Sequence, residues 1–518
     1  MDHRRLATTL LFPMSFTTTP HSSESAQATS RRWLVLAIVS VALLLIVIDM
    51  TVLYTALPRL THELHASNSH KLWIVNIYAL VVSGLLLGMG TLGDRVGHKR
   101  LFLSGLGLFG LASLVAAYSP NPPALIAARA FLGVAAAMMM PATLSLIRIT
   151  FADERERAVA IGIWASVASG GAAFGPVVGG LLLEHFWWGS VFLINVPIVL
   201  IALPLGALLV PRSRPDTSRP WDLKGSLLIM VGLVACTFAI KEAGKQTPAW
   251  SLAALALVIG VLFLALFGRQ QRRSPFPLLD FSLFRNAAFT TSVVAALTAS
   301  AALIGMELVF SQRLQLVLGF SPLEAGMAIV PLPLAAFLAG PLAGKLLPRL
   351  GSARLLTGSL LLSGVGMGAY LLWHNAPQSL QAVSLALLGL GIGAAMTAAS
   401  STIMQSAPAS RAGMAASVEE MSYELGGALG VTLMGSLLSA VYSATLLLPP
   451  DANLPSTVRD SLDEALLLAD ALPQDQAVLI GELARNAFDG GYVAVLGSCT
   501  ALLFAAAISV WHFQRRQA

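Results

Sequence analysis

The chain has 518 residues, of which 56% are apolar and only 11% are charged, and its mean hydropathy is +0.76. Soluble globular proteins carry about 25% charged residues, so this composition excludes a soluble globular protein and indicates a polytopic membrane protein. The net charge of +6 comes from basic residues in short loops between apolar runs, a pattern that indicates membrane topology and argues against a nucleic-acid partner.

Residues 1–32 are polar and rich in Ser and Thr, and we expect them to form a disordered cytoplasmic segment. Fourteen apolar runs follow, twelve within the roughly 17 to 25 residues that a helix needs to cross the hydrocarbon core of a bilayer and two slightly longer. They cover residues 33–57, 71–92, 100–118, 123–147, 158–182, 190–210, 223–241, 249–268, 288–311, 323–346, 353–373, 378–404, 412–440 and 489–512.

The distribution of basic residues predicts the orientation of these helices. With the amino terminus inside the cell, 24 of the 32 Lys and Arg residues fall in the inner segments, seven fall in the outer ones, and Arg129 lies within a span. Lys and Arg accumulate on the cytoplasmic side of membrane proteins, so the bias predicts that both termini are cytoplasmic.

A glycine-rich basic turn at Gly90–Arg100, between the second and third runs, has a second copy later in the chain. Aligning it with residues 344–354 pairs Gly90 with Gly344, Arg95 with Arg349, Gly97 with Gly351 and Arg100 with Arg354. The second copy has Pro348 where the first has Asp94. We therefore interpret the chain as two repeated halves, an architecture typical of transporters that bind substrate between the halves.

These observations predict an all-α polytopic membrane protein made of two six-helix bundles plus two inserted helices. The expected parts are the N-terminal bundle at 33–210, the inserted pair with its linkers at 211–287, the C-terminal bundle at 288–512 and a cytoplasmic tail at 513–518. Within the last bundle, the outer loop 441–488 should contain one or two short amphipathic helices, at 458–468 and 477–488. Either a lid over the outer mouth or a solvated loop fits this pattern.

Three ionisable residues lie alone within predicted spans, where a charge is costly and is a functional candidate by default. Asp49 in the first span is either a proton or cation site or a structural hydrogen-bond acceptor. Arg129 in the fourth span either tunes a titrating carboxylate or holds two helices together, since it stays charged at accessible pH. Glu307 in the ninth span suits a proton carrier or a counter-charge for a cationic substrate, with a structural role as the alternative.

The thirteenth span carries three further acids. Glu420 and Glu424 are four residues apart and share one helix face, whereas Glu419 is turned about 100° away. Two carboxylates this close repel each other when both are ionised, which favours proton exchange. Glu424 is the deeper residue, and a solvent-facing position at the cytoplasmic end is the alternative for Glu419 and Glu420.

The fifth span contains a stripe of small residues. Gly171, Gly175 and Gly179 recur every four residues and are followed by Gly180, so another helix backbone can approach closely along this face. Pro176 within the stripe removes a backbone hydrogen bond and favours a kink.

Methionine and aromatic side chains of the spans are candidates for an adaptable cavity that binds flat apolar cations. The alternative for each is contact with lipid or with other helices. The two cysteines and nine histidines lack metal-ligand spacing, so neither a cofactor nor a metal is expected. The candidate cavity residues are Tyr54, Trp164, Phe174, Met306, Met421 and Tyr423.

The motifs together resemble the major facilitator superfamily, and within it the fourteen-span drug:proton antiporters. Asp94, Arg95, Gly97 and Arg100 are similar to the superfamily signature between spans two and three, and 171–182 is similar to the antiporter signature of span five. Further similarity is found at 48–58, at Arg129 with Gly133, at 305–308 and at 418–426, and it points to bacterial efflux pumps for methyl viologen and quaternary ammonium compounds.

The resemblance implies a proton-coupled antiporter, monomeric and in the bacterial inner membrane, that exports cationic amphipathic drugs by alternating access. It implies that Asp49, Glu307, Glu424 and Glu420 carry protons or drug charge while Arg129 modulates one of them. The turn with Gly90, Asp94, Arg95, Gly97 and Arg100 would act as an inner conformational latch. Export of an endogenous metabolite remains an alternative. A membrane-embedded enzyme is disfavoured because clustered His, Ser or Cys residues and an ATP-binding loop are missing from the sequence. A channel is disfavoured because buried acids on separate helices favour gated exchange over a continuous pore.

Overall fold

The fold is known from a computed structural model, which describes residues 21–212, 215, 221–243, 248–408, 412–448, 455–470 and 472–515. The side chains of 21–30 and some in the fifth helix and near the gaps are not described. Residues 1–20 of the segment expected to be disordered lie outside this set, and 21–32 form the first turns of a helix. The described part of the chain is helical and contains no strand, which confirms the predicted all-helical membrane fold.

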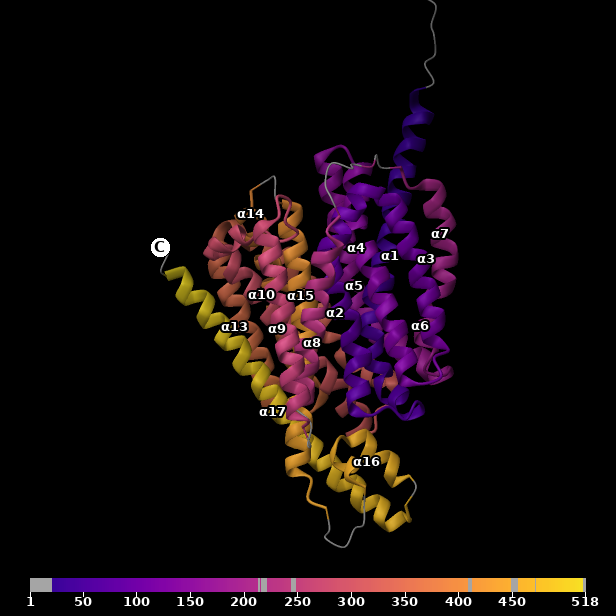
Figure 1. The fold of residues 1–518 in the computed structure, drawn as a ribbon, viewed down its shortest axis with the longest axis vertical. Helices are drawn as coiled ribbons and strands as arrows, with labels where there is room; N and C mark the ends of the chain where they lie inside the picture. Colours follow the sequence, from indigo (N-terminus) through magenta and orange to yellow (C-terminus); the bar gives the residue numbers. More distant parts are fainter. Residues whose placement is uncertain are drawn as a thin grey trace, which may run out of the picture.

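The first half of the chain forms a bundle of long helices, drawn in indigo to magenta in Figure 1. Its members are α1 (His21–Glu63), α2 (Asn68–Val96), α3 (His98–Ala117), α4 (Pro122–Thr150), α5 (Glu154–His185), the short α6 (Ser190–Leu193) and α7 (Asn195–Leu209). Two helices follow it, α8 (Leu223–Ala243) and α9 (Trp250–Arg273).

The second half forms the other bundle. It contains η1 (Phe281–Arg285), α10 (Ala287–Gln312) with the π-helical turn η2 (Arg313–Val317), α11 (Pro322–Ile329), α12 (Pro331–Leu350), α13 (Ser352–Trp373), α14 (Gln378–Ser406), α15 (Ala412–Thr445), η4 (Ser456–Arg459), α16 (Leu462–Ala469) and α17 (Gln474–Arg515).

Each predicted apolar run coincides with one of these helices or with a consecutive pair of them. Among the described residues, thirteen helices are long and apolar enough to cross a membrane. The remaining run, 158–182, lies in α5, a helix of 32 residues.

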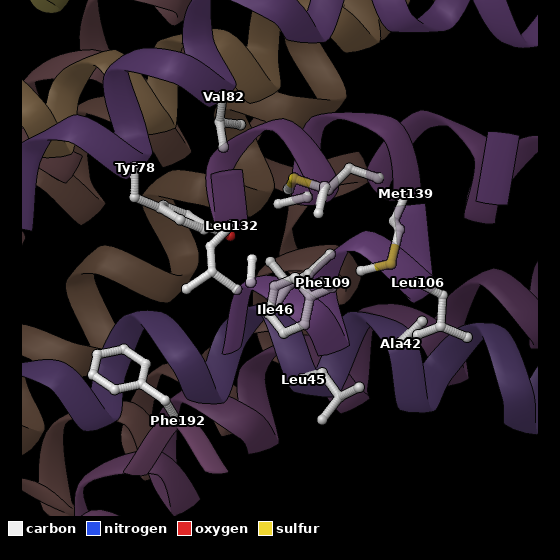
Figure 2. Close-up of a cluster of buried hydrophobic side chains, with 14 of the residues drawn as sticks. Ala42, Leu45, Ile46, Tyr78, Val82, Leu106, Phe109, Leu132, Met139 and Phe192 are labelled. Carbon is white, nitrogen blue, oxygen red and sulfur yellow. The ribbon is translucent and has the colours of Figure 1, made fainter. Parts of the chain in front are cut away.

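Two large clusters form most of the apolar interior, one centred in each half. The first joins side chains of α1 to α7 with Leu308 of α10 and Val431 of α15. Figure 2 shows part of it, where Ile46 of α1, Phe109 of α3 and Leu132 of α4 converge. The second joins α10 to α17 and includes Tyr370, Tyr442 and Tyr492. Each half therefore has a large core of its own, and Leu308 and Val431 of the second half also pack into the core of the first.

The repeated turns have the same backbone geometry. Gly97 separates α2 from α3 with φ of 95°, and Gly351 separates α12 from α13 with φ of 79°, both in the region that favours glycine. Each glycine N–H donates to the carbonyl four residues earlier, at 2.9 Å. We call the end of the molecule with these turns the inner end, at the top of Figure 1, and the opposite end the outer end.

Helix α8 lies where the two halves meet, since it packs against α2 of the first half and α15 of the second. Two glycines of α2 allow this approach: a Cβ at Gly84 would lie 2.5 Å from the Cβ of Met230, and one at Gly88 would lie 2.1 Å from Ser226 Oγ. Helix α9 packs on α8 and leaves most of its surface exposed.

The predicted outer helices form a cap. The stretch 458–468 is split between η4 and α16, and 477–488 is the beginning of α17. Val458, Leu462 and Ala465 are buried, so this segment packs on the bundle and is not a solvated loop. Figure 1 shows α16 below the outer ends of the long helices.

Candidate functional site

The buried ion pair of the first half joins Asp49 of α1 to Arg129 of α4. Arg129 Nη1 donates to Asp49 Oδ2, and neither residue is more than 1% exposed. Arg129 Nε donates to the Ile74 carbonyl at 3.2 Å, and its guanidinium lies 4.7 Å from the centre of the Tyr78 ring. Arg129 therefore faces an acid and also contacts α1 and α2 from α4. These contacts join the helices, and the pairing with Asp49 leaves open whether Arg129 tunes a titrating carboxylate.

A central cavity of about 180 Å³ lies between the two halves, beside this pair. The first half contributes Tyr54, Asn76, Tyr78 and Arg129, and the second contributes Glu424 among others. Cavity walls from both halves are what a transporter needs to change access to a bound molecule.

Three side chains that line this cavity carry buried polar atoms without hydrogen-bond partners among the described residues. Glu424 Oε2, Asn76 Oδ1 and the Tyr78 hydroxyl are buried and have no hydrogen-bond partner within the described residues. Buried polar groups are normally paired, so unpaired ones at a cavity mark places where a ligand or water can bind. The amide of Asn76 also crosses the boundary between the halves, where its Nδ2 donates to Thr432 Oγ1 at 2.8 Å.

Glu307 lies apart from the central cavity, in a chamber of about 10 Å³, which is room for roughly one water molecule. Thr51, Tyr54 and Pro176 of the first half line this chamber together with Glu307. Because Tyr54 also lines the central cavity, its ring lies between the two spaces. In the described part of the chain, Glu307 forms no ion pair or side-chain hydrogen bond.

A larger cavity of about 370 Å³ lies at the inner end between the halves. Glu420, Asp94 and Trp164 line it, so it joins one acid of α15 to the turn between α2 and α3. Asp94 accepts from His98 Nε2 at 3.1 Å, and Arg95 and Arg100 are exposed. Gly90 also lines the cavity, and a Cβ there would meet no atom within 4 Å.

Glu419 points away from the cavity that Glu420 lines. It is 9% exposed and accepts from the Tyr423 hydroxyl at 3.2 Å. The solvent-facing alternative is therefore wrong for Glu419, because its carboxylate is held inside the bundle.

The glycine stripe of α5 packs on α1. A Cβ at Gly175 would lie 1.8 Å from Thr51 Oγ1, and one at Gly179 would lie 2.4 Å from Val52 Cγ2. Gly171 faces Leu44 and Val47 of α1, whose nearest atoms lie 2.9 and 3.2 Å from its Cβ position.

The other motif residues of α5 face the second half. A Cβ at Gly180 would lie 2.5 Å from the Leu323 Cα of α11, and the Pro176 carbonyl lies 2.3 Å from the Cβ position of Gly326. Helix α5 therefore links the two halves at their outer ends and continues through Pro176.

Three of the six residues proposed to contact substrate line a described cavity, namely Tyr54, Trp164 and Tyr423. Met306 is 0% exposed within the core of the second half, and Met421 packs against the cluster near η1. Phe174 is 64% exposed and lies seven residues before the exposed Leu181, on one face of α5. None of these three lines a cavity that the structure describes. The sequence could not separate them from cavity residues, because apolar side chains of a span fit lipid, core or cavity equally well.

The outer end is closed by polar contacts between the halves that the sequence did not reveal. Lys71 of α2 donates to Asp463 of α16 and to Gln312 of α10, the latter at 2.9 Å, and both charged side chains are 5% exposed. Gln315 donates to the Thr55 carbonyl at 3.0 Å. The described polar contacts therefore close the outer end, and a cavity between the halves lies at the inner end.

Asn76 and the Lys71–Asp463 pair were missed for definable reasons. A search for ionisable residues inside spans passes over a neutral amide, although Asn76 is the polar interruption of an apolar run. Lys71 lies at a span end and Asp463 in a polar segment, so nothing in the sequence pairs residues 392 positions apart. Among the described residues, no group of three His, Cys, Asp or Glu side chains is placed to hold a metal ion.

Comparison with known proteins agrees with this geometry. Residues 39–431 match the family model described as Major Facilitator Superfamily. The chain is 42% identical to the methyl viologen resistance protein SmvA of Salmonella typhimurium, over 93% of this chain and 98% of that protein. It is 40% identical to the multidrug efflux pump LfrA of Mycolicibacterium smegmatis, over 93% of this chain and 96% of that one.

Among solved structures, a bacterial homologue of the human lysosomal transporter Spinster has the same fold. It superposes with a TM-score of 0.64 at 16% identity and covers 93% of this chain and 98% of that chain.

Proposed function

Since the chain belongs to the major facilitator superfamily, we propose that it is a proton-coupled multidrug exporter of cationic, amphipathic compounds that works by alternating access. Membership in this family makes it a multi-pass membrane transporter and not an enzyme. The names of its relatives, a methyl viologen resistance protein and a multidrug efflux pump, support methyl viologen, quaternary ammonium compounds, dyes and cationic antiseptics as substrates.

The observation that carries the proposal is that Glu424 and Glu307 lie at cavities between the halves without a basic partner among the described residues. A buried carboxylate without a counter-charge is stable only when it binds a proton or a cation. The cationic substrate and the proton therefore compete for the same groups, and this competition is a sufficient basis for exchange.

The acids form a series from the inner end towards the outer end. Glu420 lines the inner cavity, Glu424 the central cavity and Glu307 the chamber behind Tyr54. In the proposed cycle a cation enters from the inner side and displaces protons from Glu420 and Glu424. After the outer end opens, protons from outside return to these carboxylates and release the cation.

Asp49 has a different part in this cycle. Its negative charge is balanced by Arg129, which also lines the central cavity. We infer that a proton on Asp49 frees Arg129 to turn towards Glu424, which would couple the acids of the two halves.

The turn with Asp94, Arg95, Gly97 and Arg100 is proposed as the inner latch that forms when the inner cavity closes. The proposed topology has both termini in the cytoplasm of a bacterial inner membrane, because of the positive-inside distribution of Lys and Arg. The proposed working unit is a monomer, since both halves of the site come from one chain.

The test is transport by purified protein in lipid vesicles with an imposed pH gradient. We expect the gradient to drive accumulation of ethidium and methyl viologen, and collapse of the gradient with a protonophore to abolish it. Transport that persists after the collapse, or no cation transport at all, would refute the proposal.

A further inference from the structure

A hollow of about 520 Å³ lies at the inner end of α9, outside the path between the two halves. Three arginines of α9, Arg269, Arg272 and Arg273, line it together with Phe281 of η1. Leu264, Ala265 and Gly268 complete the wall. The transport cycle proposed above uses none of these residues.

The positive charge of the hollow is not neutralised by the described part of the protein. Arg269 and Arg273 are exposed and form no ion pair with any described residue, and Arg272 lies over the Phe281 ring at 5.6 Å. The neighbouring carboxylate of Asp222 is engaged by the side-chain amides of Gln270 and Gln271, at 2.8 and 2.9 Å. Three guanidinium groups therefore converge on one hollow without a counter-ion.

The surface that leads to the hollow is apolar. Leu255, Leu262 and Leu266 are 57%, 51% and 41% exposed, and their spacing places them on the α9 face that continues to Arg269 and Arg273. At 1.5 Å per residue, the stripe from Leu255 to Arg269 is about 21 Å long. This exceeds the roughly 15 Å depth of one leaflet of the hydrocarbon core, and α9 is long enough to cross a membrane with the arginines near its C-terminal end. We therefore expect the arginines at the level of the lipid headgroups.

We propose that this hollow binds an anionic phospholipid, with its phosphate among Arg269, Arg272 and Arg273 and its acyl chain along the exposed stripe of α9. Guanidinium groups match phosphate oxygens in charge and in planar hydrogen-bond geometry. The aromatic ring of Phe281 and the missing side chain at Gly268 leave room for the glycerol part of the lipid. A basic hollow beside an apolar helix face at the headgroup level is the combination that recognises such lipids.

The experiment is lipid binding to the purified full-length protein, measured by native mass spectrometry with phosphatidylglycerol and with phosphatidylcholine. Combined R269Q, R272Q and R273Q should weaken phosphatidylglycerol binding on the order of a hundredfold, since each basic residue near an anionic surface contributes about a fivefold factor. The matched control is K345Q, R349Q and R354Q, three exposed basic residues at another inner helix end, which removes the same charge and should leave binding within about twofold.

A second variant tests the hollow separately from the charge. A Cβ at Gly268 would lie 4.0 Å from Phe281 Cζ, so G268L keeps all three arginines, fits the helix and occupies the part of the hollow beside Phe281. We expect it to lose phosphatidylglycerol binding as well. Unchanged binding in G268L, or equal losses in both triple variants, would overturn the site in favour of diffuse attraction.

Free inorganic phosphate and glycerol 3-phosphate distinguish the two sources of the phosphate group. Neither should displace the lipid at equal concentration, because each lacks the acyl chain that contacts α9. Full displacement would overturn the lipid assignment and indicate a site for a soluble anion. Equal binding of phosphatidylcholine would also contradict the proposal, since a zwitterionic headgroup cannot neutralise the arginines.

Discussion

At the scale of single residues, Asp49 of α1 and Glu307 of α10 differ in whether their replacement by a neutral residue leaves an unpaired charge in the protein. Asp49 is bound to a buried arginine, so its removal leaves Arg129 charged and without a counter-ion. Glu307 has no basic partner in the described structure, and its removal leaves only a water-sized chamber with one more neutral group.

We therefore expect Asp49→Asn to destabilise the protein by about 3–5 kcal/mol, the usual cost of leaving a buried charge unpaired. Thermal unfolding in detergent, followed by tryptophan fluorescence, measures this. In the double variant with Arg129→Gln the loss should be smaller than for Asp49→Asn alone. Additive losses would show that the two side chains do not interact.

Glu307→Gln should leave the unfolding temperature near that of the wild type and should impair export of divalent cations more than that of monovalent ones. The reason is that a divalent substrate needs more counter-charge than a monovalent one, so the loss of one carboxylate affects it more. Vesicle transport of methyl viologen and ethidium makes the comparison. An equal loss for both substrates would instead assign Glu307 to proton coupling.

At the scale of elements, α16 is the part of the second half that closes on the first. The Lys71–Asp463 pair beneath it is buried, whereas the nearby pair of His62 with Asp470 is exposed at 55% and 71%. The exposed pair is a control for the buried one, because both lie at the same interface and an exposed ion pair contributes only about 0–1 kcal/mol to stability.

Asp463→Asn should weaken the closed outer end, since it leaves Lys71 buried with only Gln312 as a partner. A cysteine introduced at Gln315, in a protein with Cys236 and Cys499 replaced by alanine, should then react faster with an outside alkylating reagent. Asp470→Asn is the control and should change the rate little. Equal rates in both variants would mean that α16 does not restrain the outer end.

The contact between α2 and α8 gives a second prediction for an element. At Gly84 a Cβ would lie 2.8 Å from the Met230 Cα, so Gly84→Ala has to separate the two backbones. At Gly107 of α3 a Cβ would meet no atom within 4 Å, so Gly107→Ala should be neutral or stabilising by up to about 1 kcal/mol. The unfolding temperature should fall for Gly84→Ala only. A fall of similar size in both variants would contradict the packing argument.

At the scale of the whole molecule, the conformational cycle and substrate binding are separable. Asp94 lies at the mouth of the inner cavity with His98, away from the central cavity that contains Arg129 and Glu424. Asp94→Asn should therefore reduce the transport rate strongly and leave the affinity for ethidium nearly unchanged. Fluorescence titration beside vesicle transport tests this, and a large loss of affinity would place Asp94 in the binding site.

The helices of the molecule follow from its sequence because crossing a bilayer requires a long apolar run, and each such run forms one helix or two consecutive helices. The two repeated turns were also predictable, since Gly97 and Gly351 need a backbone that other residues disfavour. The partners of the buried charges could not be predicted from the sequence. Sequence analysis proposed Asp49 and Arg129 separately, and only the packing of α1 on α4 shows that they neutralise each other.

The apolar candidates were predicted least well, for a physical reason. Phe174 and Met306 have the same preference for a nonpolar environment, and lipid, core and cavity all satisfy it. Their helices decide among the three, so Phe174 faces outward and Met306 faces the core. A polar residue such as Asn76 is constrained more strongly, because it needs a partner wherever it lies.

The position of α8 has a consequence for compounds that are already dissolved in the bilayer. Helix α8 lies along the line where α2 and α15 meet, and α9 lies behind it. A membrane-soluble cation arriving sideways on that flank meets two helices before it reaches the acids. Sideways entry from the lipid therefore has to use the opposite flank, where α5 faces α11 and α12, so side chains there would decide which membrane-soluble compounds enter.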